Sequence, residues 1–438
     1  MSSNARALSD TGVGPVGSAS ATQPYLFTPL DAPWLKIGYS AIAIAVFLSG
    51  HSILHFRSFN FTLSDVALVT AAVIFAARGR LGVQPFGSLT ALWLLGFTLM
   101  IGALFISSAI NGDPIRWINV AAQYAIAFLL VPFVLSSADI RFTRRLPMLF
   151  VIGISLSQLI GIIAFSLFTY EDTHEILGPG FLAGNGRIGA MAGEANPNGA
   201  FIAFSLPMLI YSWRMGLIRR WMAVACAILL TWGLLLSASF TGFVASVIAV
   251  TITLAIIGFR HLLVAASVAL VAVTLFIASN ATLPETFRER VSSPITTGDL
   301  SQAGTFVARS ELIEEAWEFS KDRLLIGMGA DQYREQSVYG APVHNLELLM
   351  WTEGGAVAFI GLLILLCLLM LLAIIGFRKH REETAMAVAV VVVFFIYTMS
   401  IPHMYSRFWT VPVMVALSTI YALRGAPPKL PGTASAAF

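Results

Sequence analysis

Apolar residues gather along the chain into about twelve long runs, separated by connections rich in polar residues and glycine. A helix needs roughly 20 apolar residues to cross the hydrocarbon of a bilayer, and the runs approach or exceed that length. They occupy residues 34–54, 61–77, 89–110, 117–136, 147–168, 198–213, 219–236, 240–258, 261–278, 346–376, 385–401 and 408–423. Because backbone groups in lipid must be hydrogen-bonded internally, the pattern predicts an all-α polytopic membrane protein with about 12 transmembrane helices.

The composition agrees with this class. Of the 438 residues, 57% are hydrophobic and 11% are charged, and the mean hydropathy is +0.82. An ordinary soluble domain carries about 25% charged residues. The two cysteines, Cys226 and Cys367, both fall inside predicted spans. The sequence therefore indicates neither a disulfide framework nor a cysteine metal site.

Basic residues are distributed unevenly between the two sets of short loops. With the N-terminus inside, the inner loops carry twelve and the outer loops three. The inner residues are Arg78, Arg80, Arg141, Arg144, Arg145, Arg214, Arg219, Arg220, Arg260, Arg378, Lys379 and Arg381, and the outer ones are Arg57, Arg116 and Arg407. An excess of Lys and Arg marks the cytoplasmic side. We therefore expect both termini in the cytoplasm, with residues 1–33 as a disordered tail and residues 424–438 as a second tail.

Two long segments fall on the outer side. Residues 169–197, within the block of nine helices predicted at 34–278, include the glycine-rich stretch "GPGFLAGNGRIGAMAGEANPNG", which forms turns rather than regular structure. The second segment, predicted at 279–344, contains the 64-residue connection from Asn280 to Val343 and precedes the last three helices at 345–423. Its "FVARSELIEEAWEFSKDRLLIGMG" spaces apolar residues helically among charges. It predicts an amphipathic helix that lies on the membrane surface or over a cavity.

A histidine stands where the polar segment meets the tenth apolar run, in "YGAPVHNLELLMWTEGG". His344, with Asn345, can satisfy free backbone groups at a helix start. Alternatively, His344 acts as a general base, because imidazole titrates near neutral pH. Glu347 lies one helical turn further along and is placed to orient the ring, whereas Glu353 belongs to the same helix start without a defined role.

Isolated arginines on the outer side are candidate anion ligands. Arg187 is the one basic residue in its glycine-rich segment, and glycines allow a ligand to approach the backbone closely. Arg288 and Arg290 open the long loop, and Arg309 begins its predicted helix. A guanidinium matches phosphate bidentately and stays charged near lipid. The ordinary alternative is an arginine that is solvated or paired with lipid headgroups.

Other candidates give weaker signals. Glu314, Glu315 and Glu318 match the solvated face of the surface helix, and His403 and Arg407 lie on the last outer loop. The sequence carries no P-loop, HExxH or GxSxG motif. Charged residues are almost absent from the middle of the predicted spans, which argues against ion-coupled transport.

The order of these pieces resembles the O-antigen ligase and polymerase superfamily of bacterial inner-membrane glycosyltransferases. The resemblance rests on "GNGRIGAMAGEANPNGAF", then "RSELIEEAW" and "LLIGMGADQY" in the long outer loop, then "VHNLELLMWTEGG". It implies a C-type (GT-C-like) glycosyltransferase architecture with a large helical periplasmic loop. It also implies an undecaprenyl-pyrophosphate-linked O-antigen donor, the lipid A core oligosaccharide as acceptor, and no metal, cofactor or nucleic acid.

Carried over to this chain, the resemblance assigns the catalytic histidine to His344, the first essential arginine to Arg187 and the loop arginine to Arg288. Arg290 is close enough in sequence to take the place of Arg288, and Arg309 matches a position that contributes to binding or to structure. Asn198 and Asn345 are expected to bind pyrophosphate or sugar, and Glu347 and Glu194 to orient catalytic groups. With no carboxylate placed as an enzyme nucleophile, the reaction is predicted to invert the anomeric centre.

Three functions remain as alternatives at the level of sequence. An O-antigen ligase is preferred because "HNLELLMWTEGG" is close to the ligase pattern. A polymerase that joins lipid-linked repeat units uses the same donor chemistry and differs in its acceptor. A transporter of lipid-linked saccharide predicts helices broken in mid-span, which the apolar runs support poorly.

Overall fold

The computed structural model describes residues 33–56, 61–178, 180–279, 282–299, 301, 306–402 and 407–424. The predicted tails lie almost wholly outside these residues, as does His403. The longer helices are α1 (Pro33–Leu48), α2 (Leu63–Ala77), α3 (Thr90–Asn111), α4 (Pro114–Ala125), α7 (Leu146–Leu167), α9 (Ala195–Arg214), α10 (Arg220–Ser237), α11 (Phe240–Ile257), α12 (Phe259–Ala278), α15 (Phe306–Lys321), α17 (Leu346–Ile374), α18 (Arg381–Thr398) and α19 (Arg407–Arg424). The short elements are η1 (Gly87–Leu89), η2 (Ile126–Leu130), α5 (Val131–Ser136), α6 (Ile140–Thr143), α8 (Tyr170–Leu177), η3 (Ala190–Ala192), α13 (Glu285–Phe287), η4 (Arg288–Ser292), α14 (Ser293–Thr297) and α16 (Tyr333–Gln336).

Each of the twelve apolar runs is helical over most of its length, and the chain is a polytopic membrane protein. Within the described residues, six helical stretches are long and apolar enough to cross a bilayer. They are Gly87–Asn111, Pro114–Ser136, Ile140–Leu167, Arg220–Ser237, Phe240–Ile257 and Leu346–Ile374. The other six runs form α1, α2, α9, α12, α18 and α19, which are shorter or less apolar.

The first apolar run, 34–54, does not form one helix. α1 ends at Leu48, and the chain then turns through Ser49 and His51 into β1 (His55–Phe56), which pairs antiparallel with β2 (Phe61–Thr62). Gly50 explains the close turn, because an added Cβ there would overlap the side chain of Ile154. Apart from this short pair of strands, the regular structure of the described chain is helical.

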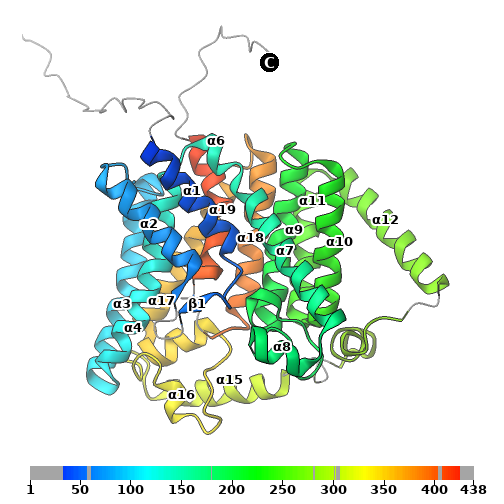
Figure 1. The fold of residues 1–438 in the computed structure, drawn as a ribbon. Helices are drawn as coiled ribbons and strands as arrows, with labels where there is room; N and C mark the ends of the chain where they lie inside the picture. Colours follow the sequence, from blue (N-terminus) through cyan, green and yellow to red (C-terminus); the bar gives the residue numbers. More distant parts are fainter. Residues whose placement is uncertain are drawn as a thin grey trace, which may run out of the picture.

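The helices form a bundle in which α9 is central (Figure 1). It contacts α7, α10, α11 and α18. Gly199 of α9 lies against the first turn of α11, where an added Cβ would come 2.8 Å from the Cβ of Ser239. Small residues let membrane helices approach this closely. The packing brings the segment before α9 next to the turn between α10 and α11.

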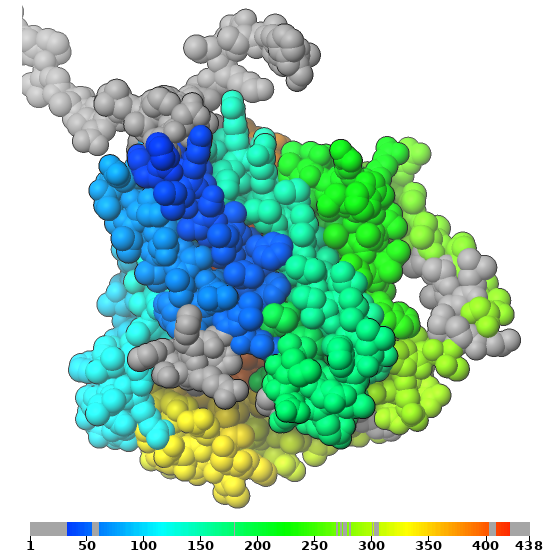
Figure 2. Space-filling model, in the orientation of Figure 1, coloured from blue at the N-terminus to red at the C-terminus, as the bar shows by residue number. Residues whose placement is uncertain are grey.

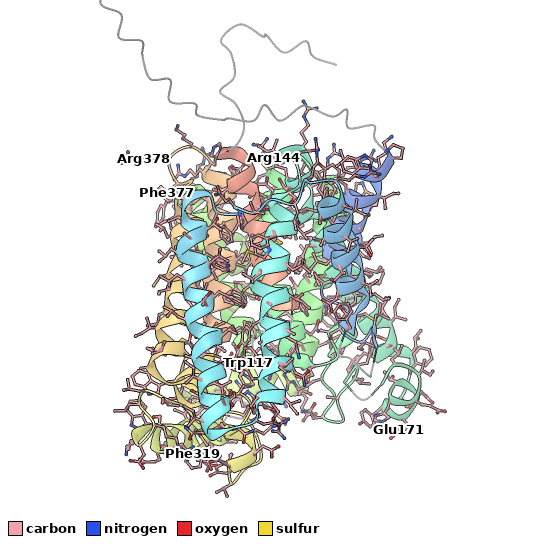
Figure 3. The ribbon with its side chains drawn as sticks, turned by 90° about the vertical axis from the view of Figure 1, so that its left-hand side faces the viewer. Trp117, Arg144, Glu171, Phe319, Phe377 and Arg378 are labelled. Atoms are coloured by element: carbon pink, nitrogen blue, oxygen red, sulfur yellow. The ribbon has the colours of Figure 1, made fainter. Side chains whose placement is uncertain are left out.

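The two ends of the bundle differ in character. Arg144 and Arg378 lie at one end, and Glu171 and Phe319 at the other (Figure 3). Ion pairs tie the loops of the first end together: Arg144 contacts Glu383 at 3.4 Å, and Arg214 contacts Glu382 at 2.7 Å. The opposite end, here called the α15 end, carries α8, α15 and α16, and Figure 2 shows α8 and the segment around α16 on its surface.

The tenth apolar run is broken by Gly355, whose φ of 74° interrupts α17. The segment just after α15 satisfies the backbone groups that the break releases: Ala356 N donates to Leu324 O at 2.8 Å, and Met328 N donates to Thr352 O at 2.9 Å. Such bonding is what allows irregular backbone near lipid. The break separates the first turns of α17 from the half that runs through the bundle.

Glu353 has a structural part in this arrangement. Its side chain is buried, and it accepts hydrogen bonds from the backbone N–H groups of Asp331 at 2.9 Å and Tyr333 at 3.4 Å. Its carbonyl accepts another from Gly329 N at 2.8 Å. Glu353 therefore fastens the Gly-Met-Gly loop, residues 327–329, and the turn that follows it to α17.

Candidate active site

Arg187 is held by a tight turn of the glycine-rich segment. Leu182 and Ile188 form an isolated antiparallel bridge, and Ala183 N donates to Arg187 O at 2.9 Å. Gly186 closes the turn with a φ of 73°, a conformation that glycine adopts at little cost. The short hairpin directs the arginine inward, and the residue is only 8% exposed.

The guanidinium of Arg187 binds neutral groups only, among the described residues. Its Nε donates to Ser237 O and its Nη2 to Asn196 Oδ1, both at 2.8 Å. The same Asn196 Oδ1 accepts from Ser239 Oγ at 3.3 Å, and Asn196 O accepts from the Tyr397 hydroxyl at 3.3 Å. Asn196 is therefore a hub that fixes the arginine without neutralising its charge.

Two further arginines share this neighbourhood. Arg290 and Arg309 both interact electrostatically with Arg187, which comes from a distant part of the chain. Burial and these two positive charges lower the pKa of Arg187 to about 10, so it remains protonated at neutral pH. Burial also lowers the pKa of Arg309, and Arg290 adds to that effect.

The cluster of Arg187, Arg290 and Arg309 is positively charged and incompletely bonded. The Nε atoms of Arg290 and Arg309 are buried and have no hydrogen-bond partner in the part of the chain that the structure describes. Within that part, none of the three arginines forms an ion pair with a carboxylate. Buried donors of this kind are costly unless they are satisfied, and a phosphate or another anion satisfies them.

Arg288 and Arg290 are separated by the fold. Arg288 is exposed, with 61% of its side chain accessible, and it pairs with Glu285 at 3.8 Å. Arg290 is half-buried and faces the other arginines. The cause is local geometry, because both residues belong to the π-helical turn η4 and residues two apart on a helix do not share a face. The structure thus brings Arg290, and not Arg288, into the cluster.

His344 lies beside the cluster, directly before the N-cap of α17. Burial lowers the pKa of His344, and the positive charge of Arg309 lowers it further, while a hydrogen bond with the backbone of Ser400 acts in the opposite direction. The imidazole is therefore neutral at neutral pH. Its Nδ1 atom is buried and lacks a partner among the described residues. A neutral ring with a free nitrogen is able to take a proton.

The two asparagines named from the sequence have structural contacts. Asn345 caps α17, and its Oδ1 accepts from Leu348 N at 2.8 Å. Asn198 is buried and exchanges hydrogen bonds with Gln158 at 2.7 and 3.2 Å, and it also donates to Ile188 O at 3.2 Å. These bonds occupy the amide of Asn198, which ties α7 and α9 to the hairpin that carries Arg187.

The two carboxylates named as orienting groups form no hydrogen bond or ion pair with His344 in the described part of the chain. Glu347 Oε1 accepts from Thr398 Oγ1 at 2.6 Å, whereas its Oε2 is buried with no partner in the described chain. Glu194 is the N-terminal boundary residue of α9, and burial raises its pKa. The described residues hold no group of three or more His, Cys, Asp or Glu side chains suited to a metal ion.

Tyr397 and Asn196 were missed as site residues by the sequence reasoning. Tyr397 lies within a run of Val and Phe, which predicts nothing but a membrane span. Asn196 precedes a proline in a turn-rich stretch, a position that is typical of a turn residue. The sequence feature that could have identified Asn196 as a site residue is its position two residues before Asn198, at the start of a helix. No sequence feature identifies Tyr397.

The fold and the site together define a polytopic helical membrane protein with a partly buried cationic cluster, adjoined by a neutral histidine, at one end of its bundle. Residues 224–363 match the family model described as O-Antigen ligase. The chain thus carries an O-antigen ligase family domain, which confirms the resemblance drawn from the sequence; members of the family are ligases and polymerases of O-antigen assembly. The matched part contains Arg290, Arg309 and His344, while Arg187 precedes it. A search of curated proteins found no match.

Proposed function

We propose that this protein is an inverting glycosyltransferase that moves O-antigen polysaccharide from undecaprenyl pyrophosphate to a sugar hydroxyl of the lipid A core. The observation that carries the proposal is the cluster of Arg187, Arg290 and Arg309, which has no carboxylate partner among the described residues and lies beside a neutral His344. Family membership supplies the class of substrate, a lipid-linked O-antigen.

The arginine cluster stabilises the leaving group. As the bond between the anomeric carbon and the phosphate oxygen breaks, the electron pair stays on the pyrophosphate, whose negative charge increases. Guanidinium groups that are already in position stabilise this charge more in the transition state than in the ground state. Arg187 is the best held of the three, because Asn196 and Ser237 fix its orientation.

His344 activates the acceptor. A sugar hydroxyl is a weak nucleophile until it loses its proton, and the free Nδ1 of the neutral imidazole accepts that proton as the hydroxyl oxygen bonds to the anomeric carbon. The products are the new glycoside, undecaprenyl pyrophosphate and a proton on His344, which solvent then removes. A single displacement inverts the anomeric centre.

The proposal includes a location and an architecture. All twelve apolar helices cross a bacterial inner membrane in a GT-C-like arrangement, the α15 end faces the periplasm, and both termini are cytoplasmic. The positions of Arg144 and Arg378 at the opposite end support this orientation, since basic loops stay in the cytoplasm (Figure 3). A lipid-anchored donor then reaches the arginine cluster from the outer leaflet.

The test is transfer by the purified protein in detergent. Lipid-linked O-antigen is mixed with lipid A core in the presence of EDTA, and the product is followed on a gel. Arg187→Gln, Arg290→Gln and Arg309→Gln should each lower the rate about 100-fold or more, a loss typical of removing one donor to a developing anion. Arg288→Gln is the matched control and should keep most of the activity, since Arg288 is exposed and paired with Glu285.

Three outcomes would contradict parts of this proposal. Equal loss in Arg288→Gln and Arg290→Gln would restore Arg288 as the phosphate ligand. Product formed only with a second lipid-linked repeat unit as acceptor would identify a polymerase. No product with either acceptor would remove the transferase function altogether.

A further inference from the structure

Helix α15 has two apolar sides, of which one is covered and the other exposed. The covered side includes Leu312 and Ala316, which pack with Tyr333 in a small buried cluster. The exposed large apolar residues of α15 are Phe306, Val307, Ile313 and Trp317, and Trp317 is 54% accessible. Val307 lies about 100° from Phe306 around the helix, whereas Phe306, Ile313 and Trp317 share one side. These three residues are called the α15 stripe.

The α15 stripe occupies one line along the helix. At roughly 100° per residue, Ile313 and Trp317 lie within about 20° of Phe306, and Arg309 lies about 60° from it. The acidic residues Glu311, Glu315 and Glu318 lie about 120° or more from the stripe by the same geometry. The apolar stripe therefore adjoins the arginine of the cluster and faces away from most of the negative charge of α15.

Further exposed apolar residues follow α15 in the chain and lead to a spanning helix. Leu325, four residues after α15 ends, is 72% exposed. Its neighbour Leu324 is fixed at the break of α17 by the hydrogen bond from Ala356 N. From the break onward, Val357 and Ile360 are exposed on the outside of the bundle, where a membrane-spanning helix meets acyl chains.

The length of α17 after its break indicates where the break lies in the membrane. Residues 356–374 follow Gly355 in the helix, and these 19 residues are about the length that crosses the hydrocarbon of a bilayer. Trp351, just before the break, packs against Phe359 just after it, with ring centroids 5.0 Å apart, and its Nε1 atom is buried without a partner in the described chain. The break in α17 therefore lies at the level of the membrane interface, and Leu324 and Leu325 are held at it.

We propose that the α15 stripe, with Leu324 and Leu325, is a membrane-anchoring surface that lies in the boundary between headgroups and acyl chains of the bilayer. Its partner is the lipid surface itself, because Leu324 and Leu325 are exposed and held at the break where the exposed residues of the spanning half of α17 begin, and because the stripe avoids most of the acidic residues of α15. If the protein acts as proposed above, this anchor also holds Arg309 at the depth of the phosphates of a lipid-linked donor.

The first experiment measures what surrounds the stripe. Spin labels are attached to single cysteines, in full-length protein lacking Cys226 and Cys367, and the protein is placed in lipid nanodiscs. Labels at Ile313, Trp317 and Leu325 should show an oxygen-to-nickel accessibility ratio several-fold higher than the matched labels at Glu311 and Glu318 on the same helix. Equal nickel accessibility on both sides would mean that the stripe faces water, and shielding from both reagents would mean that protein covers it. Either result overturns the anchor.

The second experiment tests the link to transfer. The double variant Ile313→Gln, Trp317→Gln should raise the apparent KM for the lipid-linked donor several-fold, with kcat changed less. Val338→Gln is the control, because Val338 is 90% exposed and its N–H donates to Glu315, on the acidic side of α15. If the labels report lipid and the KM is unchanged, the anchor stands and the placement of Arg309 is wrong. If the wild type transfers to no acceptor, the proposed function fails and the accessibility result still decides the anchor.

Discussion

At the scale of single residues, Arg309 affects two parts of the site. Arg309 belongs to the cationic cluster, and its charge also contributes to the lowered pKa of His344. The effect keeps the imidazole neutral and able to accept a proton where it would otherwise be partly protonated. In the proposed mechanism, phosphate binding and base activation are therefore coupled through Arg309.

The pH dependence of transfer should report this coupling. His344 is active when neutral, so the rate should rise with pH through the pKa of His344, which lies below its ordinary value, and then level off. Arg309→Gln removes one cause of the lowering, so the acidic limb should move to higher pH, together with a loss in maximal rate. The measurement is the pH–rate profile of both proteins with saturating donor. An acidic limb that stays in place would show that Arg309 does not act on His344.

Sequence reasoning found some of these residues and not others, for identifiable reasons. Arg187 was recognisable because it is the one basic residue among many glycines, and His344 because it stands at the boundary of an apolar run. The choice between Arg288 and Arg290 depends on the rotation of a π-helical turn, which spacing in the sequence does not reveal. The contribution of Tyr397 depends on how α18 is turned, and the residues that directly precede it in sequence are all apolar.

At the scale of elements, the break in α17 is the feature that shapes the site. A run that reads as one apolar helix is divided at Gly355, and the segment from Leu324 to Met328 supplies the missing hydrogen bonds. The periodicity of apolar residues carries no mark of the break, because both halves are apolar. The glycine pair at 354–355 was the only local sign of it, and glycine alone does not determine a kink.

Replacing Gly355 should therefore destabilise the protein. Alanine at a φ of 74° is strained, and its Cβ would also overlap the carbonyl oxygen of Leu325. We expect Gly355→Ala to lower the free energy of unfolding by about 1–3 kcal/mol or more. Gly102→Ala in α3 is the control, because no atom lies within 4 Å of its added Cβ and alanine favours a helix by roughly 0.5–1 kcal/mol. Thermal unfolding in detergent measures both, and similar melting temperatures would contradict the importance of the break.

At the scale of the whole molecule, the distribution of charge predicts the orientation in the membrane. Arg144 and Arg378 lie at the end opposite to Phe319 of α15 (Figure 3). In a protein lacking Cys226 and Cys367, Val338→Cys should react with an impermeant maleimide added to intact spheroplasts. Lys379→Cys should react only after the cells are lysed. The reverse pattern would place the arginine cluster in the cytoplasm and exclude a periplasmic reaction.

The sequence by itself determined the helical membrane class, the positions of the apolar runs and the resemblance that the family match over residues 224–363 confirms, because these depend on composition, run length and local spacing. The tertiary structure decided which side chains lie near one another. It places Arg187 within electrostatic range of Arg290 and Arg309, and it leaves Arg288 exposed beside Glu285. Asn198 is hydrogen-bonded inside the bundle, and Glu353 holds the loop around Gly329. Contacts between residues far apart in the chain depend on how helices rotate and pack against one another. The sequence does not determine this rotation, because an apolar helix surface packs equally well against lipid and against protein.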